Sequence, residues 1–194
     1  RFIEKNPGTD ETPVDPMDGT GTDGFYRIVH LDCGRKYFSK DWIIALLYEM
    51  KADGYNQLQL AFGNDGLRFL LDNMSFTANG TTYDFDTIKT RVELGNKTQN
   101  ASGDGRWLTE KEMDEIINKA KELGIEIVPL LNLPGHANTV LCIANGEYTK
   151  YGTYNVYGSF NTINFENDAA YNFALEIFKK YVDYFSDKGC RFFS

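Results

Sequence analysis

Short apolar runs recur along the chain and are separated by longer segments of mixed polarity. Runs that are nearly continuous in apolar residues are typical of strands whose two faces are both covered. On this basis strands are predicted at residues 25–33, 57–62 and 125–133, with a fourth opening at 190–193.

Between these runs the apolar positions return every three or four residues, which predicts helices. Helices are expected at about 39–54, at 109–124 and from Asn167 or Asp168 onward. Ser39 can cap the first of them. Thr109 and Glu112 have the spacing of a capping box at the start of the second, which gives that helix the strongest support.

Two segments depart from this alternation. Residues 1–24 are rich in Pro, Gly, Asp and Thr, a composition that buries no core and predicts a linker or arm. Residues 67–106 form a long polar excursion, in which Asn79-Gly80 predicts a hairpin turn. The folded unit is therefore expected to be residues 25–194.

The alternation of strands and helices predicts an α/β fold with a parallel sheet and helical crossovers. A complete eight-stranded barrel needs about 250 residues, so four strands in about 170 residues predict a partial (β/α)8 TIM barrel. The alternative is an open doubly wound sheet. Because no Gly-x-Gly-x-x-Gly or phosphate loop follows any strand, a nucleotide site in such a sheet has no support.

Composition narrows the function classes. The chain has 194 residues, 42% of them hydrophobic, which is enough for a sizeable core. A net charge of −8 argues against nucleic acid or an anionic membrane surface as a partner. No apolar run approaches the ~20 residues that span a bilayer, so no membrane insertion is expected. The chain begins at Arg1 without an initiator Met, and we expect it to be part of a longer protein.

Cofactor chemistry has little support in the sequence. The three cysteines, Cys33, Cys142 and Cys190, are widely spaced, and only two histidines are present. This pattern argues against a zinc site, and no metal or other cofactor is expected.

Candidate chemistry follows the ends of the predicted strands. A Pro-Gly turn ends the third strand and leaves His136 at its C-terminal end. Asp32 and Arg35 follow the first strand, and Asp65 follows the second. In a barrel of this type the C-terminal ends of the strands form the face that carries active sites.

Each of these residues also has an ordinary structural explanation. His136 could be a packed turn histidine, Asp32 a strand-end cap, Arg35 a surface charge and Asp65 an Asx-turn residue. Their placement on one rim favours a shared site. An arginine with carboxylates and a histidine suits a ligand rich in hydroxyl groups, because guanidinium donates in a fixed fork and carboxylates accept from hydroxyls.

Over roughly residues 25–194 the chain resembles glycoside hydrolase family 20, the β-N-acetylhexosaminidases. The resemblance is carried by the Asp-x-x-Arg of Asp32 and Arg35, by Asp65 in Gly-Asn-Asp-Gly, and by the Pro-Gly-His-Ala that contains His136. It implies that residues 25–194 are the N-terminal half of a hexosaminidase catalytic barrel.

The resemblance also implies roles. Arg35 would bind the 3- and 4-hydroxyls of a terminal N-acetylhexosamine, and Asp32 would support Arg35 at the base of the pocket. Asp65 and His136 would form a hydrogen-bonded network beside the catalytic acid. The family's catalytic Asp-Glu pair follows strand four and would begin just beyond Ser194, so no catalytic residue is expected within the chain.

One departure concerns the third strand. Many family members carry Glu and Asp where this chain has Leu130 and Asn132, which resembles a bacterial surface-enzyme variant.

The function implied is hydrolysis of terminal β-linked N-acetylhexosamine from glycans by substrate-assisted retaining catalysis, in a secreted or cell-surface protein. Alternatives are a lacto-N-biosidase, a non-catalytic carbohydrate-binding half-barrel and an unrelated parallel-sheet binding module. Open strand edges also predict self-association, or a second chain that completes the barrel.

Overall fold

A computed structural model describes residues 24–98, 103–146, 158–159 and 161–194. The predicted linker or arm at residues 1–24 therefore lies outside the described residues, except for Gly24. No helix in the described part of the chain has both the length and the apolar character that crossing a bilayer requires.

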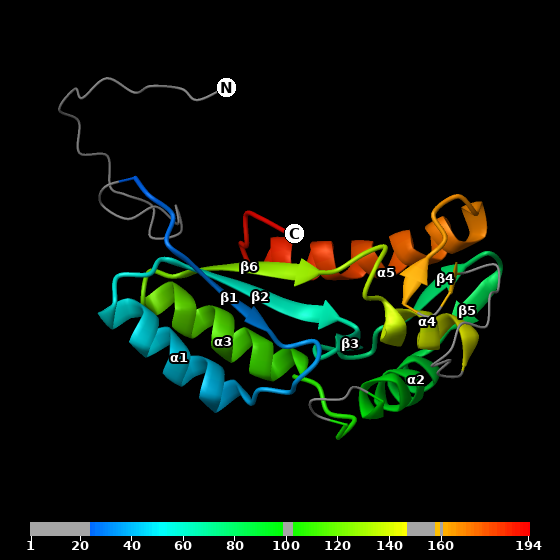
Figure 1. Cartoon of the computed structure of the whole chain (residues 1–194), viewed down its shortest axis with the longest axis horizontal. Coiled ribbons are helices and arrows are strands. Elements are labelled where there is room, and N and C mark those ends of the chain that lie inside the picture. The colour runs from blue at the N-terminus through cyan, green and yellow to red at the C-terminus, as the bar shows by residue number, and fades with distance from the viewer. Residues whose placement is uncertain (1–23, 99–102, 147–157, 160) are drawn as a thin grey trace.

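Three parallel strands form the centre of the fold (Figure 1). They are β1 (Ile28–Asp32), β2 (Gln57–Asn64) and β6 (Glu126–Leu131). Ile28 pairs with Gln57, and Gln57 pairs in turn with Glu126, so the three strands are neighbours in chain order. A short strand, β3 (Gly66–Leu67), turns back antiparallel to the end of β2.

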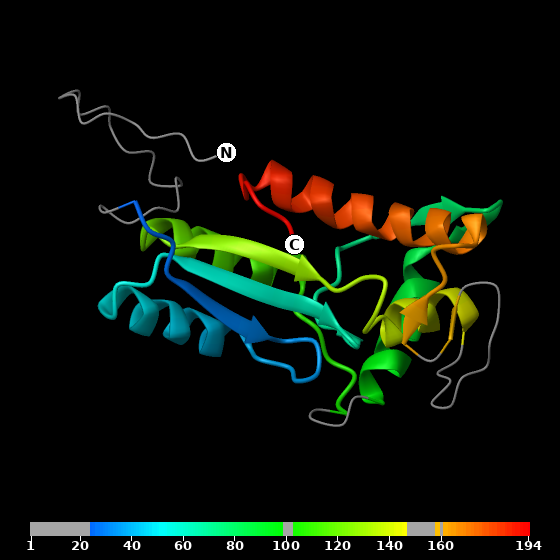
Figure 2. The ribbon, with the colours of Figure 1, turned by 45° about the horizontal axis from the view of Figure 1, so that its top comes forward.

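The crossover helices cover one face of this sheet. Helices α1 (Lys40–Ala52) and α3 (Glu110–Glu122) lie side by side, and α5 (Asp168–Asp187) runs beside β6 (Figures 1 and 2). Parallel strands in chain order with helices on one face are the arrangement of the opening part of a (β/α)8 barrel, as predicted.

Side chains along β2 alternate between the two faces of the sheet, and this alternation places the core on the side of the helices. Leu58, Leu60 and Phe62 are fully buried toward the helices. The ring of Phe62 lies 4.8 Å from that of Tyr181 and 5.5 Å from that of Phe185, both on α5. Aromatic burial of this kind joins α5 to the sheet.

The predicted helix starts are confirmed. The Ser39 hydroxyl accepts from the backbone N–H of Trp42, and Asn167 caps α5. At α3 the reciprocal capping box between Thr109 and Glu112 is complete.

The polar excursion contains more structure than predicted. The hairpin is confirmed as β4 (Phe76–Ala78) and β5 (Thr81–Tyr83). The sequence predicts no helix in this segment, and this prediction was wrong, because α2 (Phe85–Lys97) follows the hairpin. Its apolar stripe consists mainly of Ile88 and Val92, too narrow to stand out in a charged segment.

Further elements were also not predicted. Helix α4 (Asn138–Asn145) has no side-chain cap at its N-terminus, so the usual start signal is missing. A small hairpin, β7 (Gly158–Ser159) and β8 (Thr162–Ile163), precedes α5. Helices α2 and α4 and the β4–β5 hairpin gather at the end of the sheet where the strand arrows point (Figure 1).

The expected fourth strand at 190–193 is only partly realised. Residues 190–194 have irregular backbone, and the pairing begins at the last residue. The Ser194 N–H donates to the carbonyl of Pro129 at 2.9 Å, and its carbonyl accepts from Leu131 at 3.0 Å. The chain thus reaches the free edge of β6 where the next barrel strand belongs.

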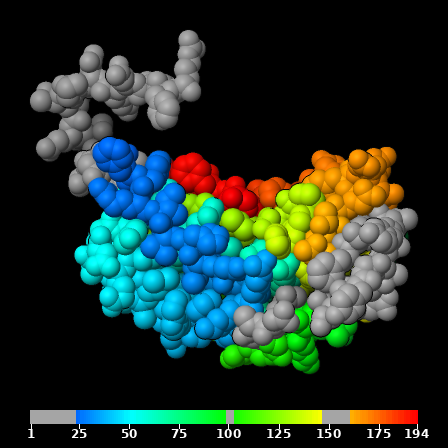
Figure 3. All heavy atoms as spheres, in the orientation of Figure 1, coloured from blue at the N-terminus to red at the C-terminus, as the bar shows by residue number. Residues whose placement is uncertain are grey.

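The face of the sheet opposite the helices carries both polar and apolar side chains, and the C-terminal residues cover part of it. Gln57 donates to Glu126 at 2.8 Å, and Arg191 donates to both carboxylate oxygens of Glu126 at 2.9 and 3.1 Å. Ile28 and Phe192 are 52% and 43% exposed on the rim of this face. In Figure 3 the C-terminal residues (red) line a hollow between the N-terminal strand (blue) and the start of α5 (orange).

The capping box gives a stability prediction. Thr109→Ala removes the side chain that accepts from Glu112 N–H, and should lower the free energy of unfolding of the 194-residue chain by about 1 kcal/mol. Urea denaturation measures this. The control is Thr90→Ala in the interior of α2, where the threonine is exposed and the change should be neutral or slightly stabilising, because alanine has the higher helix propensity. Equal effects of the two substitutions would contradict the role of the cap.

Candidate functional site

The predicted site residues meet at the C-terminal edge of the sheet. Asp32 is the last residue of β1, and Arg35 follows in the loop to α1. Asp65 lies directly after β2, and His136 lies in the loop between β6 and α4. Parallel strands bring these four positions to one edge, as the sequence predicts.

Arg35, Asp65 and His136 lie within hydrogen-bonding distance of one another. Arg35 Nε donates to Asp65 Oδ2 at 2.8 Å, and Arg35 Nη2 lies 3.0 Å from His136 Nδ1. His136 Nδ1 also lies 3.2 Å from Asp65 Oδ1. This nitrogen accepts from Arg35 when it is unprotonated and donates to Asp65 when it carries a proton.

The group faces solvent on one side. The Arg35 and His136 side chains are 47% and 45% exposed, whereas Asp65 is 16% exposed beneath them. A ligand can therefore approach the guanidinium and the imidazole, while the carboxylate holds both in place.

Both loops have a constrained backbone. Asp65 and His136 are non-glycine residues with φ of 62° and 52°, in the left-handed region. Such residues cost of order 1–3 kcal/mol each and persist where surrounding bonds hold them. Asp65 N–H donates to the His136 carbonyl at 2.5 Å, and Thr139 N–H donates to the Asp65 carbonyl at 2.9 Å.

Asp32 lies beside this group and bonds to different partners. Its carboxylate accepts from the Gly34 N–H at 3.0 Å and from Asn64 Nδ2 at 2.7 Å. Asn132 Nδ2 in turn lies 3.3 Å from Asn64 Oδ1. Asp32 thus shapes the turn that carries Arg35 through its hydrogen bond to Gly34, and the implied support of Arg35 is indirect.

The turn after β1 is tightly packed against the end of β2. A Cβ on Gly34 would lie 2.2 Å from the carbonyl oxygen of Asn64, and a Cβ on Gly66 would lie 2.2 Å from the carbonyl oxygen of Gly34. Only glycine fits at either position without moving backbone.

Sequence reasoning missed Asn64 and Arg68. Asn64 joins Asp32 to Asn132 across three strand ends, and its signal is a polar amide at the end of an apolar strand. Arg68 is 1% exposed and donates to the carbonyl of Gly34 at 3.1 Å and to Asp104 Oδ1 at 2.9 Å. Burial lowers the pKa of Arg68, and the charge of Asp104 opposes that shift. A single arginine between apolar neighbours was the available signal.

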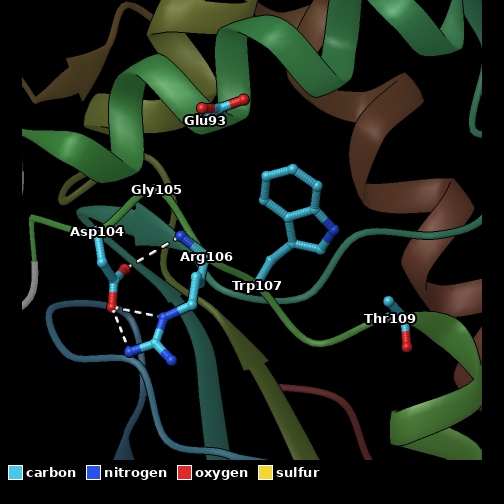
Figure 4. A pocket seen from close by; sticks show the side chains of 6 residues that line it. All are labelled: Glu93, Asp104, Gly105, Arg106, Trp107 and Thr109. Atoms are coloured by element: carbon cyan, nitrogen blue, oxygen red, sulfur yellow. Dashed lines mark hydrogen bonds and ion pairs between the residues drawn. The ribbon is translucent and has the colours of Figure 1, made fainter.

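A separate pocket lies beside the ion pair between Asp104 and Arg106 (Figure 4). It has a volume of about 340 Å³ and is lined by Glu93, Asp104, Gly105, Arg106, Trp107 and Thr109. Arg106 Nε and Nη2 pair with Asp104 at 2.9 and 2.8 Å, and Glu93 pairs with Lys97. The charged groups of this pocket thus form ion pairs with each other or with Lys97.

Comparisons with known proteins identify the family to which the chain belongs. A family model described as Glycosyl hydrolase family 20, catalytic domain, matches residues 25–192. The chain is 31% identical over 131 residues to beta-hexosaminidase B of Pseudoalteromonas piscicida, and 28% identical over 130 residues to N,N'-diacetylchitobiase of Vibrio harveyi. Each match covers 64% of this chain but only 17% and 15% of the relative.

Solved structures show the same arrangement of elements. A structure of the tandem catalytic modules of the pneumococcal exo-beta-D-N-acetylglucosaminidase StrH aligns with a TM-score of 0.78 at 33% identity, covering 92% of this chain and 42% of that chain. Streptomyces plicatus N-acetyl-beta-hexosaminidase aligns with a TM-score of 0.62 at 23% identity, covering 82% of this chain and 30% of that chain. These alignments confirm the predicted partial (β/α)8 barrel. With a family match that spans residues 25–192, the chain belongs to glycosyl hydrolase family 20.

Proposed function

We propose that residues 25–194 form the N-terminal half of the catalytic barrel of a β-N-acetylhexosaminidase. The complete protein would hydrolyse terminal β-linked N-acetylhexosamine from glycans. The observation that carries the proposal is the group formed by Arg35, Asp65 and His136 at the catalytic edge of a family 20 barrel. The hexosaminidase and chitobiase relatives support the substrate class.

In this proposal Arg35 binds the sugar directly. Its Nε and Nη2 are held by Asp65 and His136, and among the described residues Nη1 has no partner. A planar guanidinium held along one edge presents its remaining N–H groups in a fixed direction, which suits two adjacent hydroxyls of a pyranose ring.

Asp65 and His136 would support the catalytic acid. The acid, and the aspartate that orients the acetamido group, would come from residues that follow strand four. The acetamido oxygen attacks the anomeric carbon as the glycosidic bond breaks, and the acid protonates the leaving oxygen. Asp65 and His136 fit a role beside this acid because each can accept or relay a hydrogen bond at the same edge.

We further infer a secreted or cell-surface location in a bacterium. The relatives named above are bacterial glycosidases, which supports this inference. Glycans are too polar to cross a bilayer unaided, so an enzyme that acts on glycans outside the cell has to be located outside the cell membrane.

Removing the guanidinium tests the proposed sugar contact. In the protein extended through the rest of the barrel, Arg35→Ala should lower kcat/KM for an aryl β-N-acetylglucosaminide by tenfold or more. Charge-assisted hydrogen bonds contribute about 1.5–3 kcal/mol each, which corresponds to at least that factor. Steady-state kinetics give the measurement.

The matched control is Lys36→Ala. Lys36 is an exposed cation next to Arg35 in the same loop, and its ammonium nitrogen lies 5.1 Å from the centre of the Phe38 ring. It should leave kcat/KM within about twofold, because a cation–π contact at an exposed site contributes only about 0.5–1 kcal/mol. A loss below tenfold for Arg35→Ala would place Arg35 outside the sugar pocket.

The 194-residue chain alone should show no measurable turnover of the same substrate. General acid catalysis typically contributes 10²–10⁴-fold, and the expected acid lies outside this sequence. Release of the aryl group is followed with purified chain. Turnover that disappears on substitution of a residue within 1–194 would show that the chain carries its own catalytic machinery.

Exposed apolar side chains beside the sheet edges predict assembly. Exposed Ile28 and Phe192 flank unpaired strand edges, so the 194-residue chain should self-associate or bind a second chain that completes the barrel. Light scattering at micromolar concentration reports this. A monodisperse monomer that unfolds cooperatively would show that the sheet is self-sufficient.

A further inference from the structure

We propose that Arg68 is a positioning residue for Arg35, acting through the carbonyl of Gly34. The inference rests on the proposed function, in which Arg35 binds sugar hydroxyls. Arg68 lies on the far side of the turn from the site, and its effect on substrate would pass through the main chain.

The burial of Arg68 indicates that its guanidinium group makes specific hydrogen bonds. Its side chain is 1% exposed, and a buried guanidinium is costly unless its N–H groups are matched by acceptors. Besides Gly34 and Asp104, it donates to the carbonyls of Arg106 at 2.8 Å and Asn96 at 3.4 Å.

The bond to Gly34 connects Arg68 to the site. The Gly34 carbonyl belongs to the peptide group whose nitrogen is that of Arg35, so fixing this carbonyl fixes the orientation of the peptide that leads into Arg35. Asp32 holds the preceding peptide through the Gly34 N–H. Arg68 from one side and Asp32 from the other thus fix both polar groups of Gly34.

Arg68 is itself held rigidly. Asn96 is fully buried on α2, and its side chain accepts from Leu67 N–H and donates to the Leu67 carbonyl, each at 2.8 Å. Asp104 pairs with Arg68 and also with Arg106, the pair seen in Figure 4. Residues at the end of the long segment between β2 and α3 therefore hold Arg68 in place behind the turn.

Small displacements of this turn matter for a sugar contact. Hydrogen bonds weaken steeply with angle and distance, and a misplacement of about 1 Å far from the chemistry can cost about 10²-fold in rate. Arg68→Lys keeps the charge but cannot span carbonyl acceptors on several segments with one ammonium group. The Gly34 carbonyl should then lose its fixed donor.

A double-mutant cycle tests the proposal in the protein extended through the rest of the barrel. Arg68→Lys should lower kcat/KM for the aryl glycoside about tenfold when Arg35 is present. In an Arg35→Ala background the same change should cost less than about twofold, because the residue on which it acts is gone. Both are measured well below the melting temperature of each variant.

Equal losses in the two backgrounds would show that Arg68 only stabilises the fold, and no loss with Arg35 present would also overturn the proposal. If Arg35→Ala itself changes nothing, the proposed function fails instead, so the two failures are distinct.

Tyr181→Phe is the control for general destabilisation. It removes a buried hydrogen bond to the Phe69 carbonyl, next to Arg68, without touching the turn, and should cost the same in both backgrounds.

Should Arg68→Lys not fold, Asp104→Asn provides the second variant. It leaves Arg68 in place and weakens the ion pair that orients it. The same dependence on Arg35, with a smaller loss of about threefold, is expected. Losses of equal size in both backgrounds would refute the positioning role.

Discussion

The loops after β2 and β6 are joined by main-chain hydrogen bonds between Asp65 and the segment that holds His136 and Thr139. These bonds keep two non-glycine residues in left-handed conformations that cost of order 1–3 kcal/mol each. The same two residues supply the carboxylate and imidazole that hold Arg35. The backbone contact and the side-chain geometry are therefore one constraint, and neither loop could move without the other.

The segment between β2 and α3 provides the support behind this contact. A simple crossover needs only a short loop, whereas here a hairpin and α2 are inserted. Asn96 at the end of α2 satisfies both main-chain groups of Leu67, and the buried Arg68 follows at once. The insertion thus packs polar groups against the back of the site in an arrangement where each has a partner, which favours a single rigid geometry.

Much of the fold could be predicted because its signals are local. The capping box at Thr109 and the apolar run of β6 depend only on neighbouring residues. The site edge was also predictable, since parallel strands place Asp32, Asp65 and His136 together. Helix α4 has no capping side chain, and Arg68 finds its partners 28 to 38 residues away along the chain. Contacts of that range leave no mark on local periodicity.

The ion pair between Glu126 and Arg191, on the face of the sheet opposite the helices, limits how a barrel can continue from this sheet. Glu126 is fully buried and pairs with Arg191, while Ser194 bonds to the backbone of β6. A slip of one residue between the C-terminal run and β6 would turn Arg191 away and leave a buried carboxylate without its cation, a cost of several kcal/mol. The Glu126 carboxylate therefore fixes the register in which the next strand pairs with β6 as the barrel closes.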